Sequence, residues 1–504
     1  MKTYLLGIDV GTTNWKAGLF EPNGKIYSLV SHTTLTHFDK NENAYYLPQE
    51  LSKTIFNLVK QLTKKVKDPK CIRGIAITGM AEAGVPINKE GNWLYPAITW
   101  FDKRTQPQMN WWKKNCNLNE LYKITGLDLS YIYSINKIMW LKENEPDIFK
   151  KIFKWLCIPD YIAFKLTGEM KMDYSIASRT MAFDISKKMW SSKLCNKAGI
   201  DSNIFPDTVQ SGTLIGKVTS SVFKQTGLAI GTPVCAGGHD HVCGAYAVGA
   251  VSEEKILDSM GTAESIFTSL NNLSNAIKVH NFGFSTGRHV YPNKFYVMGG
   301  IYSSGAIINW IKKELFKDIN THQKLIDIME KMYKGPSDIF MLPHLLGSGP
   351  PKRDSLSRAA YIGLTPNAKR EDLLIASIEG IFYEAKTTIS AIKECTGIKS
   401  IDEVILIGKM AMNKSLMDIK ASILQTKIKS PKVYEAVLLG ASMLAGVGSK
   451  IYKNADDAIK KVKMKYDVFY PDPSKAKQYS TRYNKIYKKI YPALQNLNKE
   501  ISEL

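Results

Sequence analysis

No apolar stretch of this sequence is long enough to cross a bilayer as a helix, so we expect no membrane partner. The apolar N-terminus is interrupted at Asp9, and no small-residue cleavage site follows it, so we do not interpret it as a signal peptide. A low-complexity linker is also absent. Together these absences predict a globular, cytoplasmic protein.

Cysteine is sparse, because the chain has only 7, scattered and without a C-x-x-C pair. Zinc sites of the usual spacing and a disulfide framework are therefore not expected, and the thiols fit a reducing compartment. Cys235 and Cys243 flank a conspicuous acidic residue, Asp240, but the sequence around them has no metal-binding pattern.

Acidic residues are outnumbered: 46 Asp and Glu stand against 68 Lys and Arg, a formal net charge of +22. Such a charge is one signature of a nucleic-acid-binding protein. The excess is mainly lysine and is spread along the chain, and lysine lacks the bidentate geometry of arginine. We interpret the excess as solvated helix faces and expect no nucleic-acid partner; steeply salt-dependent binding to DNA or RNA would indicate the contrary.

The length is informative, since 504 residues exceed what one ordinary core encloses. The composition, 44% hydrophobic and 23% charged, is that of a globular protein. We therefore predict two large domains, residues 1–250 and 251–504.

The stretch that carries the most chemistry is Gly237–Gly244, with the sequence G-G-H-D-H-V-C-G. It follows an apolar run, residues 232–236, that predicts a short buried strand, and it precedes small apolar residues that predict a helix. A carboxylate at such a glycine-flanked turn is placed to take a proton from a bound hydroxyl. Asp240 is therefore a candidate general base; a helix N-cap is the alternative.

A second candidate lies at the N-terminus, where Tyr4–Val10 predicts a strand with Asp9 near its end and the turn Gly11–Thr13 after it. Amides and hydroxyls at such a turn suit phosphate oxygens, and a neighbouring carboxylate suits a hydrated Mg²⁺. The pattern returns half a chain later in D-S-M-G-T at Asp258–Thr262. We predict two related halves, each with a phosphate-binding hairpin; the alternative is a coincidence between two glycine turns.

Polar residues also follow the predicted strand Ile72–Thr78, and we expect them to line a site for a polyhydroxylated ligand. They are Glu82, Trp100, Asp102 and Arg104. The alternative is that Trp100 is core and that Asp102 and Arg104 form a surface ion pair.

Helical patterns occupy Pro48–Lys65 and Leu373–Ile392. Near the end, tyrosines recur every four residues from Tyr479 to Tyr491. We interpret this stripe as helix packing rather than base stacking.

Taken in order, these segments resemble the FGGY carbohydrate kinases, from Leu6 to about Tyr491. The matching segments are G-I-D-V-G-T-T at Gly7–Thr13, P-A-I-T-W-F-D-K-R at Pro96–Arg104, D-Y-S-I-A-S-R-T at Asp173–Thr180, G-G-H-D-H at Gly237–His241, Y-E-A-V-L-L-G-A-S at Tyr434–Ser442 and Y-P-D-P at Tyr470–Pro473. The resemblance implies an α/β fold of two actin/hexokinase-like (ribonuclease H-like) domains around a central cleft. Sugar would bind mainly to the N-terminal half and ATP with Mg²⁺ mainly to the C-terminal half.

The resemblance also implies residue roles. Asp240 matches the general base and Asp9 the acid near Mg²⁺. The nucleotide-binding positions are Thr12, Thr13, Gly261, Thr262, Gly305, Gly408 and Asn413. The sugar-pocket positions are Glu82, Trp100, Asp102, Arg104 and His241.

Two departures from the family pattern stand out. The adenosine loop, usually rich in glycine, is I-G-K-M-A-M-N at Ile407–Asn413, so we predict that Lys409 and Met410 weaken ATP binding. Ala81 replaces the pocket arginine of glycerol kinases, and the Q-M-H segment of xylulose kinases is missing.

We therefore predict an ATP-dependent kinase of a small neutral sugar or polyol, with a ketopentose such as xylulose first, glycerol or tetritols second and sugar acids such as gluconate last. The acceptor carboxylates in the predicted pocket suit hydroxyl donors and repel an acid. A non-enzymatic, actin-like ATPase module is the alternative class. A homodimer stays open.

Overall fold

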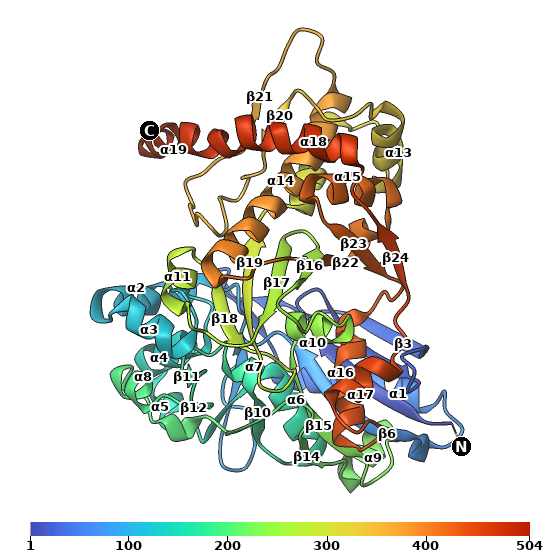
Figure 1. Ribbon diagram of the computed structural model, residues 1–504. Coiled ribbons are helices and arrows are strands. Elements are labelled where there is room, and N and C mark those ends of the chain that lie inside the picture. The colour runs from blue at the N-terminus through green and yellow to red at the C-terminus, as the bar shows by residue number, and fades with distance from the viewer. Residues whose placement is uncertain (1) are drawn as a thin grey trace. The chain divides into compact units, whose positions relative to one another are not determined.

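The computed structural model describes residues 2–504, with the side chain of Lys409 outside the description. The chain forms two compact units. Among the described residues, unit 1 comprises residues 2–251, Thr286–Tyr296 and Glu435–Met464, and unit 2 comprises Ser252–Ser285, Val297–Tyr434 and Lys465–Leu504. Each unit is an α/β structure built on its own sheet (Figure 1).

Unit 1 is built on a six-stranded sheet in the order β14-β15-β6-β1-β2-β3. The strands are β14 (Leu214–Lys217), β15 (Pro233–His239), β6 (Ile72–Gly79), β1 (Tyr4–Val10), β2 (Asn14–Phe20) and β3 (Ile26–Thr33). β1, β6 and β15 are parallel, whereas β1, β2 and β3 form antiparallel hairpins. The carboxyl ends of the three parallel strands therefore meet at one edge, which is where α/β sheets bind ligands.

The two faces of this sheet are covered by different helices. Leu6, Ile8 and Val10 of β1 belong to a core that includes α1 (Pro48–Thr63) and α6 (Ile158–Thr167). Helix α16 (Ala436–Gly448) also packs on β1 and β6, beside α10 (Asp240–Ala247) (Figure 1). The approach of α16 requires a glycine, because a Cβ on Gly7 would lie 2.3 Å from the Leu438 carbonyl oxygen.

Unit 2 repeats this strand order. The neighbouring strands, in order, are β19 (Phe295–Ile301, in this unit from Val297 onward), β17 (Glu264–Leu270), β16 (Lys255–Met260), β22 (Glu403–Ile407) and β23 (Lys427–Pro431). β16 and β17 form an antiparallel hairpin, and β16, β22 and β23 are parallel. The sequence echo between the two halves is therefore an echo of topology as well.

The echo differs in register at the acidic residue. The last paired residues before the two turns are Val10 and Met260, so Asp9 corresponds to Ser259, and Asp258 corresponds to Ile8. Because side chains alternate along a strand, Asp258 lies on the face opposite to the one that Asp9 occupies. Asp258 is accordingly fully buried in unit 2.

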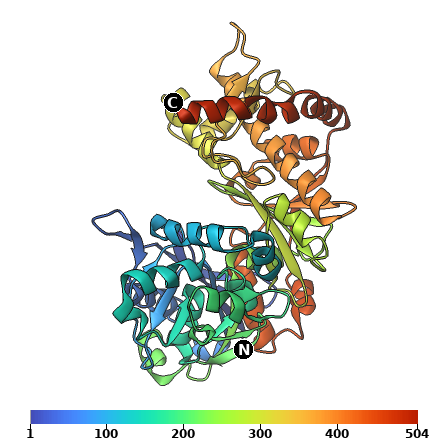
Figure 2. The same ribbon diagram turned by 90° about the vertical axis from the view of Figure 1, so that its left-hand side faces the viewer.

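The tyrosine stripe is a packing surface, as predicted. It runs along α18 (Pro473–Arg482), a π-helical turn (Tyr483–Tyr487) and α19 (Lys488–Glu503), and it packs on α14 (Arg370–Thr396). The Tyr487 ring lies 4.7 Å from that of Tyr383 on α14. The red C-terminal helices lie against the orange helix α14 in both views (Figures 1 and 2).

Two sequence expectations concern features of the chain as a whole. Among residues 2–504, no helix is both long and apolar enough to cross a membrane. The 7 cysteines are all free, and all but Cys116 are buried.

Candidate active site

Asp240 lies at the junction between the end of β15 and the start of α10. The ladder between β15 and β6 is irregular between Ala236 and Gly238, and a Cβ on Gly237 would lie 1.8 Å from the Ile77 carbonyl oxygen. A bulge of this kind re-aims the residues that follow it. Asp240 is the first residue of α10 and accepts a hydrogen bond from the His241 amide (2.6 Å), while His239 occupies the N-cap position. The alternative interpretation of Asp240 as a helix cap is therefore wrong.

The Asp240 carboxyl group is poised to be ionised. Burial raises its pKa, but His239, His241, the His241 amide and Arg179 outweigh burial and hold the pKa below its ordinary value. Its side chain retains 28% of its exposure. A base that is ionised and reachable is the arrangement that proton abstraction from a hydroxyl requires.

Asp9 lies at the end of β1 in the same unit and interacts electrostatically with Asp240. Burial and the charge of Asp240 raise the pKa of Asp9 to about 8, although Lys16 lowers it. Lys16 is itself engaged with both oxygens of Glu435, each at 2.9 Å. Among the described residues, Asp9 Oδ1 has no hydrogen-bond partner. A buried, unpartnered carboxylate oxygen is a suitable ligand for a cation.

Trp100 joins the first hairpin turn to the predicted sugar pocket. Its indole Nε1 donates to Thr12 Oγ1 (2.9 Å), while its ring packs against the core of unit 1. Thr13 is exposed at the same turn. Trp100 is thus neither a plain core residue nor a free aromatic wall, because it fixes the position of the turn.

Glu82 is buried and paired. Arg179 donates to Glu82 Oε1 from Nε (2.8 Å) and from Nη2 (2.7 Å). Burial raises the pKa of Glu82, but the Arg179 guanidinium outweighs burial and holds that pKa below its ordinary value. A carboxylate held in this way orients an arginine as much as it offers acceptor oxygens.

Asp102 and Arg104 bind each other in the interior rather than on the surface. Asp102 Oδ1 accepts from the Arg104 amide (2.8 Å) and Nε (2.9 Å), and Oδ2 accepts from Arg104 Nη2 (3.0 Å) and the Ala44 amide (2.5 Å). Their side chains are 1% and 7% exposed. Both oxygens of Asp102 are therefore already engaged, which leaves this pair better suited to hold the loop after β8 (Ala97–Ile98) than to bind a sugar hydroxyl.

Three residues near this site were not identified from the sequence. Arg179 lies within the quoted segment D-Y-S-I-A-S-R-T, but nothing in its spacing indicated that it would reach Glu82. His239 is buried, its ring centre is 5.6 Å from that of His241, and burial lowers its pKa to about 4. Lys137 is fully buried and donates to the Ile132 carbonyl, and burial lowers its pKa to about 8.

In unit 2 the structure brings together three of the predicted glycines. The Gly305 and Ala306 amides, at the start of α12 (Gly305–Leu315), donate to the carbonyl oxygens of Gly261 (3.1 Å) and Thr262 (3.0 Å). A Cβ on Gly305 would lie 2.6 Å from the Gly261 carbonyl oxygen, and one on Gly408 would lie 2.2 Å from that of Met260. The hairpin turn, the α12 N-terminus and the loop at Gly408 are therefore in close contact.

Asn413 caps a helix. Its Oδ1 accepts from the Leu416 amide (2.8 Å) at the start of α15 (Lys414–Leu424), and its Nδ2 donates to Glu330 (3.0 Å). Both ends of the amide are thus engaged within unit 2. Met412 beside it is exposed, and the predicted effect of the Lys409 side chain lies outside the described residues.

Behind the second hairpin lies a buried ion cluster. Lys420 on α15 donates to Asp258 Oδ2 (2.5 Å) and Glu264 Oε1 (2.8 Å), and Ser304 donates to Glu264 Oε2 (2.7 Å). Burial raises the pKa of Asp258 well above its ordinary value. Because Ser304 precedes α12, this cluster ties the hairpin, α15 and the α12 N-terminus into one rigid group.

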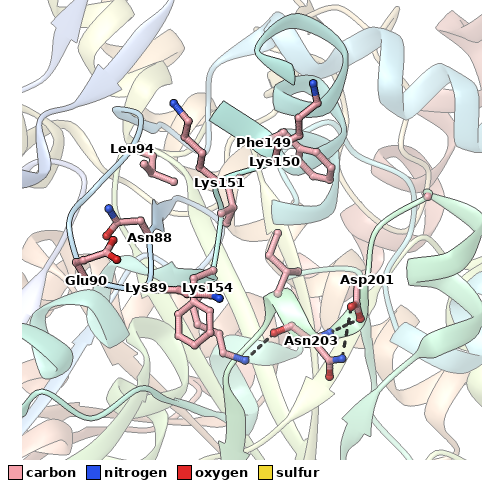
Figure 3. A pocket seen from close by; sticks show the side chains of 14 residues that line it. Asn88, Lys89, Glu90, Leu94, Phe149, Lys150, Lys151, Lys154, Asp201 and Asn203 are labelled. Atoms are coloured by element: carbon pink, nitrogen blue, oxygen red, sulfur yellow. Dashed lines mark hydrogen bonds between the residues drawn. The ribbon is translucent and has the colours of Figure 1, made fainter. Parts of the chain in front are cut away.

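A cavity of about 780 Å³ in unit 1 contains none of the predicted site residues. Lysines rim it, but the ammonium groups of Lys150 and Lys151 point away from Asp201 and Asn203 (Figure 3). Lys154 donates to the backbone carbonyls of Asn203 (2.6 Å) and Phe205 (3.0 Å). Its cations are therefore either solvated or engaged, and the cavity is separate from the candidate site.

Comparison with known proteins identifies the class. Residues 4–247 match the N-terminal domain of the FGGY family of carbohydrate kinases, and residues 258–449 match the C-terminal domain of that family. These matches span well over half of the sequence, and the chain belongs to the FGGY family of carbohydrate kinases.

The chain is 30% identical over 491 residues to the xylulose kinase of Staphylococcus xylosus, covering 97% of this chain and 99% of that one. It is also 30% identical over 498 residues to the xylulose kinase of Bacillus subtilis (strain 168), covering 98% of each. The crystal structure of gluconate kinase from Lactobacillus acidophilus matches with a TM-score of 0.89 and 23% identity over 98% of each chain. The predicted two-domain α/β fold class is thereby confirmed.

The predicted activity class is confirmed as well. A carbohydrate kinase is a phosphotransferase with an alcohol group as acceptor, and ATP is the phosphate donor in this family. The substrate is a small-molecule sugar. The hypothesis of a non-enzymatic actin-like module is not supported.

Proposed function

We propose that this protein transfers the γ-phosphate of ATP to a hydroxyl of a ketopentose, with xylulose as the first candidate. The observation that carries the proposal is the 30% identity to two xylulose kinases along nearly the whole of each chain. The Q-M-H segment being absent from Met80–Ala83 does not exclude xylulose, because contacts other than those three residues can hold the same hydroxyls.

Asp240 is the proposed general base. Its lowered pKa keeps it ionised at neutral pH, and its exposure leaves it open to an acceptor hydroxyl. Asp9 is the proposed contact for Mg²⁺, and its buried, unpartnered Oδ1 fits a cation at that place. Mg²⁺, when bound, neutralises charge on the phosphates, which is the main requirement of phosphoryl transfer.

We propose residues 1–250 as the sugar-binding half and residues 251–504 as the nucleotide-binding half. In the nucleotide half, Gly261, Thr262, Gly305 and Gly408 surround a hairpin turn whose amides and hydroxyls suit phosphate oxygens. Asn413, with both ends of its amide engaged, supports the Gly408 loop. Thr12 and Thr13 supply the matching turn in the sugar half.

The sugar pocket is proposed around Glu82, Trp100 and His241, with Asp102 and Arg104 as its support. Of the three acceptor carboxylates Glu82, Asp102 and Asp240, the first two are neutralised by Arg179 and Arg104. Repulsion of a sugar acid therefore depends on Asp240. A preference for neutral ketopentoses over gluconate is still expected, because the charge of the proposed base lies where the acceptor hydroxyl must bind.

The test is a coupled assay of ATP consumption that compares kcat/KM for xylulose, ribulose, glycerol, erythritol and gluconate. The proposal predicts that a ketopentose gives the highest kcat/KM and gluconate the lowest. A clear preference for gluconate or for glycerol would overturn the assignment of the acceptor while leaving the kinase class intact.

A further inference from the structure

A buried polar cluster lies directly behind the turn that carries Asp240. Its centre is Asp173, which is 3% exposed. Asp173 Oδ1 accepts from the Ser175 hydroxyl, and Oδ2 accepts from the Ser211 hydroxyl. Ser175 Oγ in turn accepts from the His239 amide (2.9 Å), which immediately precedes Asp240. An uninterrupted chain of hydrogen bonds therefore joins a buried carboxylate to the backbone of the candidate base.

This cluster exceeds what local structure needs. Asp173 caps α7 (Tyr174–Ala177), a single turn, by accepting from the Ser175 (2.8 Å) and Ile176 (3.1 Å) amides. A cap at the surface serves such a turn at no desolvation cost, whereas a buried carboxylate is costly unless several donors compensate it. One additional donor is the Ser211 hydroxyl. Ser175 adds a link to the His239 amide on β15, 64 residues further along the chain. The arrangement therefore serves β15 as well as α7.

The peptide group between Gly238 and His239 is also fixed on its carbonyl side. Thr78 on β6 donates its hydroxyl to the Gly238 carbonyl oxygen (2.7 Å). A Cβ on Gly238 would lie 2.8 Å from Ser175 Oγ and 3.3 Å from Asp173 Oδ1, so the backbone here is pressed against the cluster. Both polar groups of the Gly238–His239 peptide are thus bonded, and the orientation of Asp240 depends on that peptide because the ladder to β6 is already irregular at Gly237.

We infer that Asp173, acting through Ser175, is the positioning residue for Asp240. The inference rests on the proposed role of Asp240 as general base. The ionised carboxylate of Asp173 fixes the Ser175 hydroxyl as a donor toward it, which leaves the Ser175 lone pairs directed at the His239 amide. Loss of this link lets the turn relax, and a misplacement of the base by about 1 Å is enough to slow turnover markedly.

Because the charge of Asp173 depends on pH, the pH dependence of kcat can test the inference. Burial raises its pKa to about 6, although the two hydroxyls and two amides lower it. The titratable groups that interact with it are Asp160 on α6 and Cys243 on α10, and Cys235 on β15 lines the same small cavity. Burial raises the pKa of the Asp160 carboxyl and of the Cys243 thiol well above their ordinary values, and it raises the pKa of Cys235 to about 12. Asp173 is the group of the cluster whose carboxylate bonds to the serine next to the base, so its protonation is the one that the inference makes visible in turnover.

The first experiment compares Ser175→Ala with Ser211→Ala in sugar-dependent turnover. Ser175→Ala removes the link to His239, so kcat should fall by ~10- to 100-fold with much smaller changes in the KM values. Ser211→Ala removes a donor to the same carboxylate but keeps the link, so at pH 8, where Asp173 is most fully ionised, its kcat should fall much less than that of Ser175→Ala. Thermal unfolding of both variants verifies the fold.

The second experiment measures the kcat of Asp173→Asn, divided by that of wild type, from pH 5 to pH 8. The asparagine Oδ1 keeps the cap and the contact with the Ser175 hydroxyl, its Nδ2 donates to Ser211 in place of accepting, and the side chain has no charge. The ratio should approach 1 at pH 5, where wild-type Asp173 is protonated, and fall by ~10-fold at pH 8. Dividing by wild type cancels titrations of ATP that the two proteins share. This experiment decides the matter if Ser175→Ala does not fold.

Provided that the wild type is active, three results would each overturn the inference while leaving the proposed function intact. They are an unchanged kcat in Ser175→Ala, equal losses of kcat in both serine variants, and a ratio of Asp173→Asn kcat to wild-type kcat that does not change with pH. A wild type without sugar-dependent turnover would overturn the proposed function, and the inference with it.

Discussion

At the scale of single residues, the main feature is the contrast between two neighbouring carboxylates. Asp240 has a lowered pKa because two histidines and an arginine offset its burial, whereas Asp9 has a pKa raised to about 8 because burial and Asp240 act in the same direction. Environments that separate the pKa values of neighbouring groups give them different roles. Here one carboxylate is set up as a base, and the other needs a cation to be ionised at neutral pH.

The substitution Asp240→Asn should lower kcat by ~100-fold or more, the usual contribution of a general base. The asparagine Oδ1 can still accept from the His241 amide, so the fold and the affinity for sugar should change little. The measurement is steady-state turnover of the purified variant, with sugar binding followed separately by calorimetry. Turnover near the wild-type level would remove Asp240 from the mechanism.

Glu82 calls for a conservative substitution. Glu82→Ala would leave Arg179 buried without its partner, and an uncompensated buried charge costs about 3–5 kcal/mol of stability. Glu82→Gln keeps one acceptor for the guanidinium. We expect Glu82→Gln to raise the KM for the sugar by ~10-fold, since one charge-assisted hydrogen bond contributes about 1.5–3 kcal/mol.

The ATP KM should stay constant in Glu82→Gln, which serves as the internal control. An unchanged kcat/KM for the sugar would show that Glu82 only supports Arg179.

Lys409→Gly tests the altered adenosine loop. Gly408 already has a φ of +103°, so the loop uses a conformation that glycine favours, and a second glycine removes bulk where the family has bare backbone. The ATP KM should fall while the sugar KM stays constant, and Met412→Ala, at an exposed position, is the matched control. Weaker ATP binding in Lys409→Gly would mean that the lysine contacts phosphate.

At the scale of elements, strands and helices followed from sequence patterns where those patterns were regular. β1 was predicted with its observed bounds, Tyr4–Val10, because it is apolar throughout and ends at a glycine turn. A helix was predicted from the small apolar residues after Gly244, but α10 already begins at Asp240, directly after β15 ends at His239. A glycine-rich segment has too few side chains to show periodicity, so its boundary could not be predicted.

The residues of the candidate site also fall into two groups, those that a local sequence pattern could predict and those that only the fold brings together. Residues inside segments such as Gly237–His241 could be proposed from type and spacing. The pairing of Glu82 with Arg179, 97 positions apart, and of Ser175 with His239 depends on which loops the sheet brings together. Asp258 shows the limit of an echo, because one additional residue before the turn moved it to the opposite face of its strand.

The C-terminal helices contain a buried group that titrates near neutrality. Glu379 on α14 accepts from Tyr479 (2.7 Å) and from the Ser337 amide (3.1 Å), and burial raises its pKa from 4.5 to about 7. The folded protein therefore holds this proton more tightly than the unfolded chain does. The resulting stabilisation is complete below pH about 4.5, declines as the pH rises and is lost above pH about 7, with an amplitude of about 3 kcal/mol.

Glu379→Gln removes this titration while keeping an acceptor for Tyr479. The melting temperature of Glu379→Gln minus that of wild type should therefore be larger at pH 8 than at pH 5. Melting curves recorded by circular dichroism at four pH values between 5 and 8 provide the measurement. Parallel pH profiles for the two proteins would contradict the raised pKa.

At the scale of the whole molecule, two units with the same strand order each present a hairpin turn at the end of a buried strand. Unit 1 adds two carboxylates, Asp9 and Asp240, and unit 2 adds a rigid group formed around Gly261, Gly305 and Lys420. The division of labour that we propose, with sugar chemistry in one half and nucleotide binding in the other, follows from these additions to a shared frame.

The central claim is that this protein moves the terminal phosphate of ATP to a ketopentose hydroxyl. Phosphorus NMR of wild-type protein with ATP, Mg²⁺ and xylulose tests it most directly, because it separates ADP, inorganic phosphate and a sugar phosphate ester. The account predicts that ADP and one phosphate ester form in equal amounts, and that ADP formation stops when xylulose is left out. ADP and inorganic phosphate forming at the same rate with or without the sugar would contradict it.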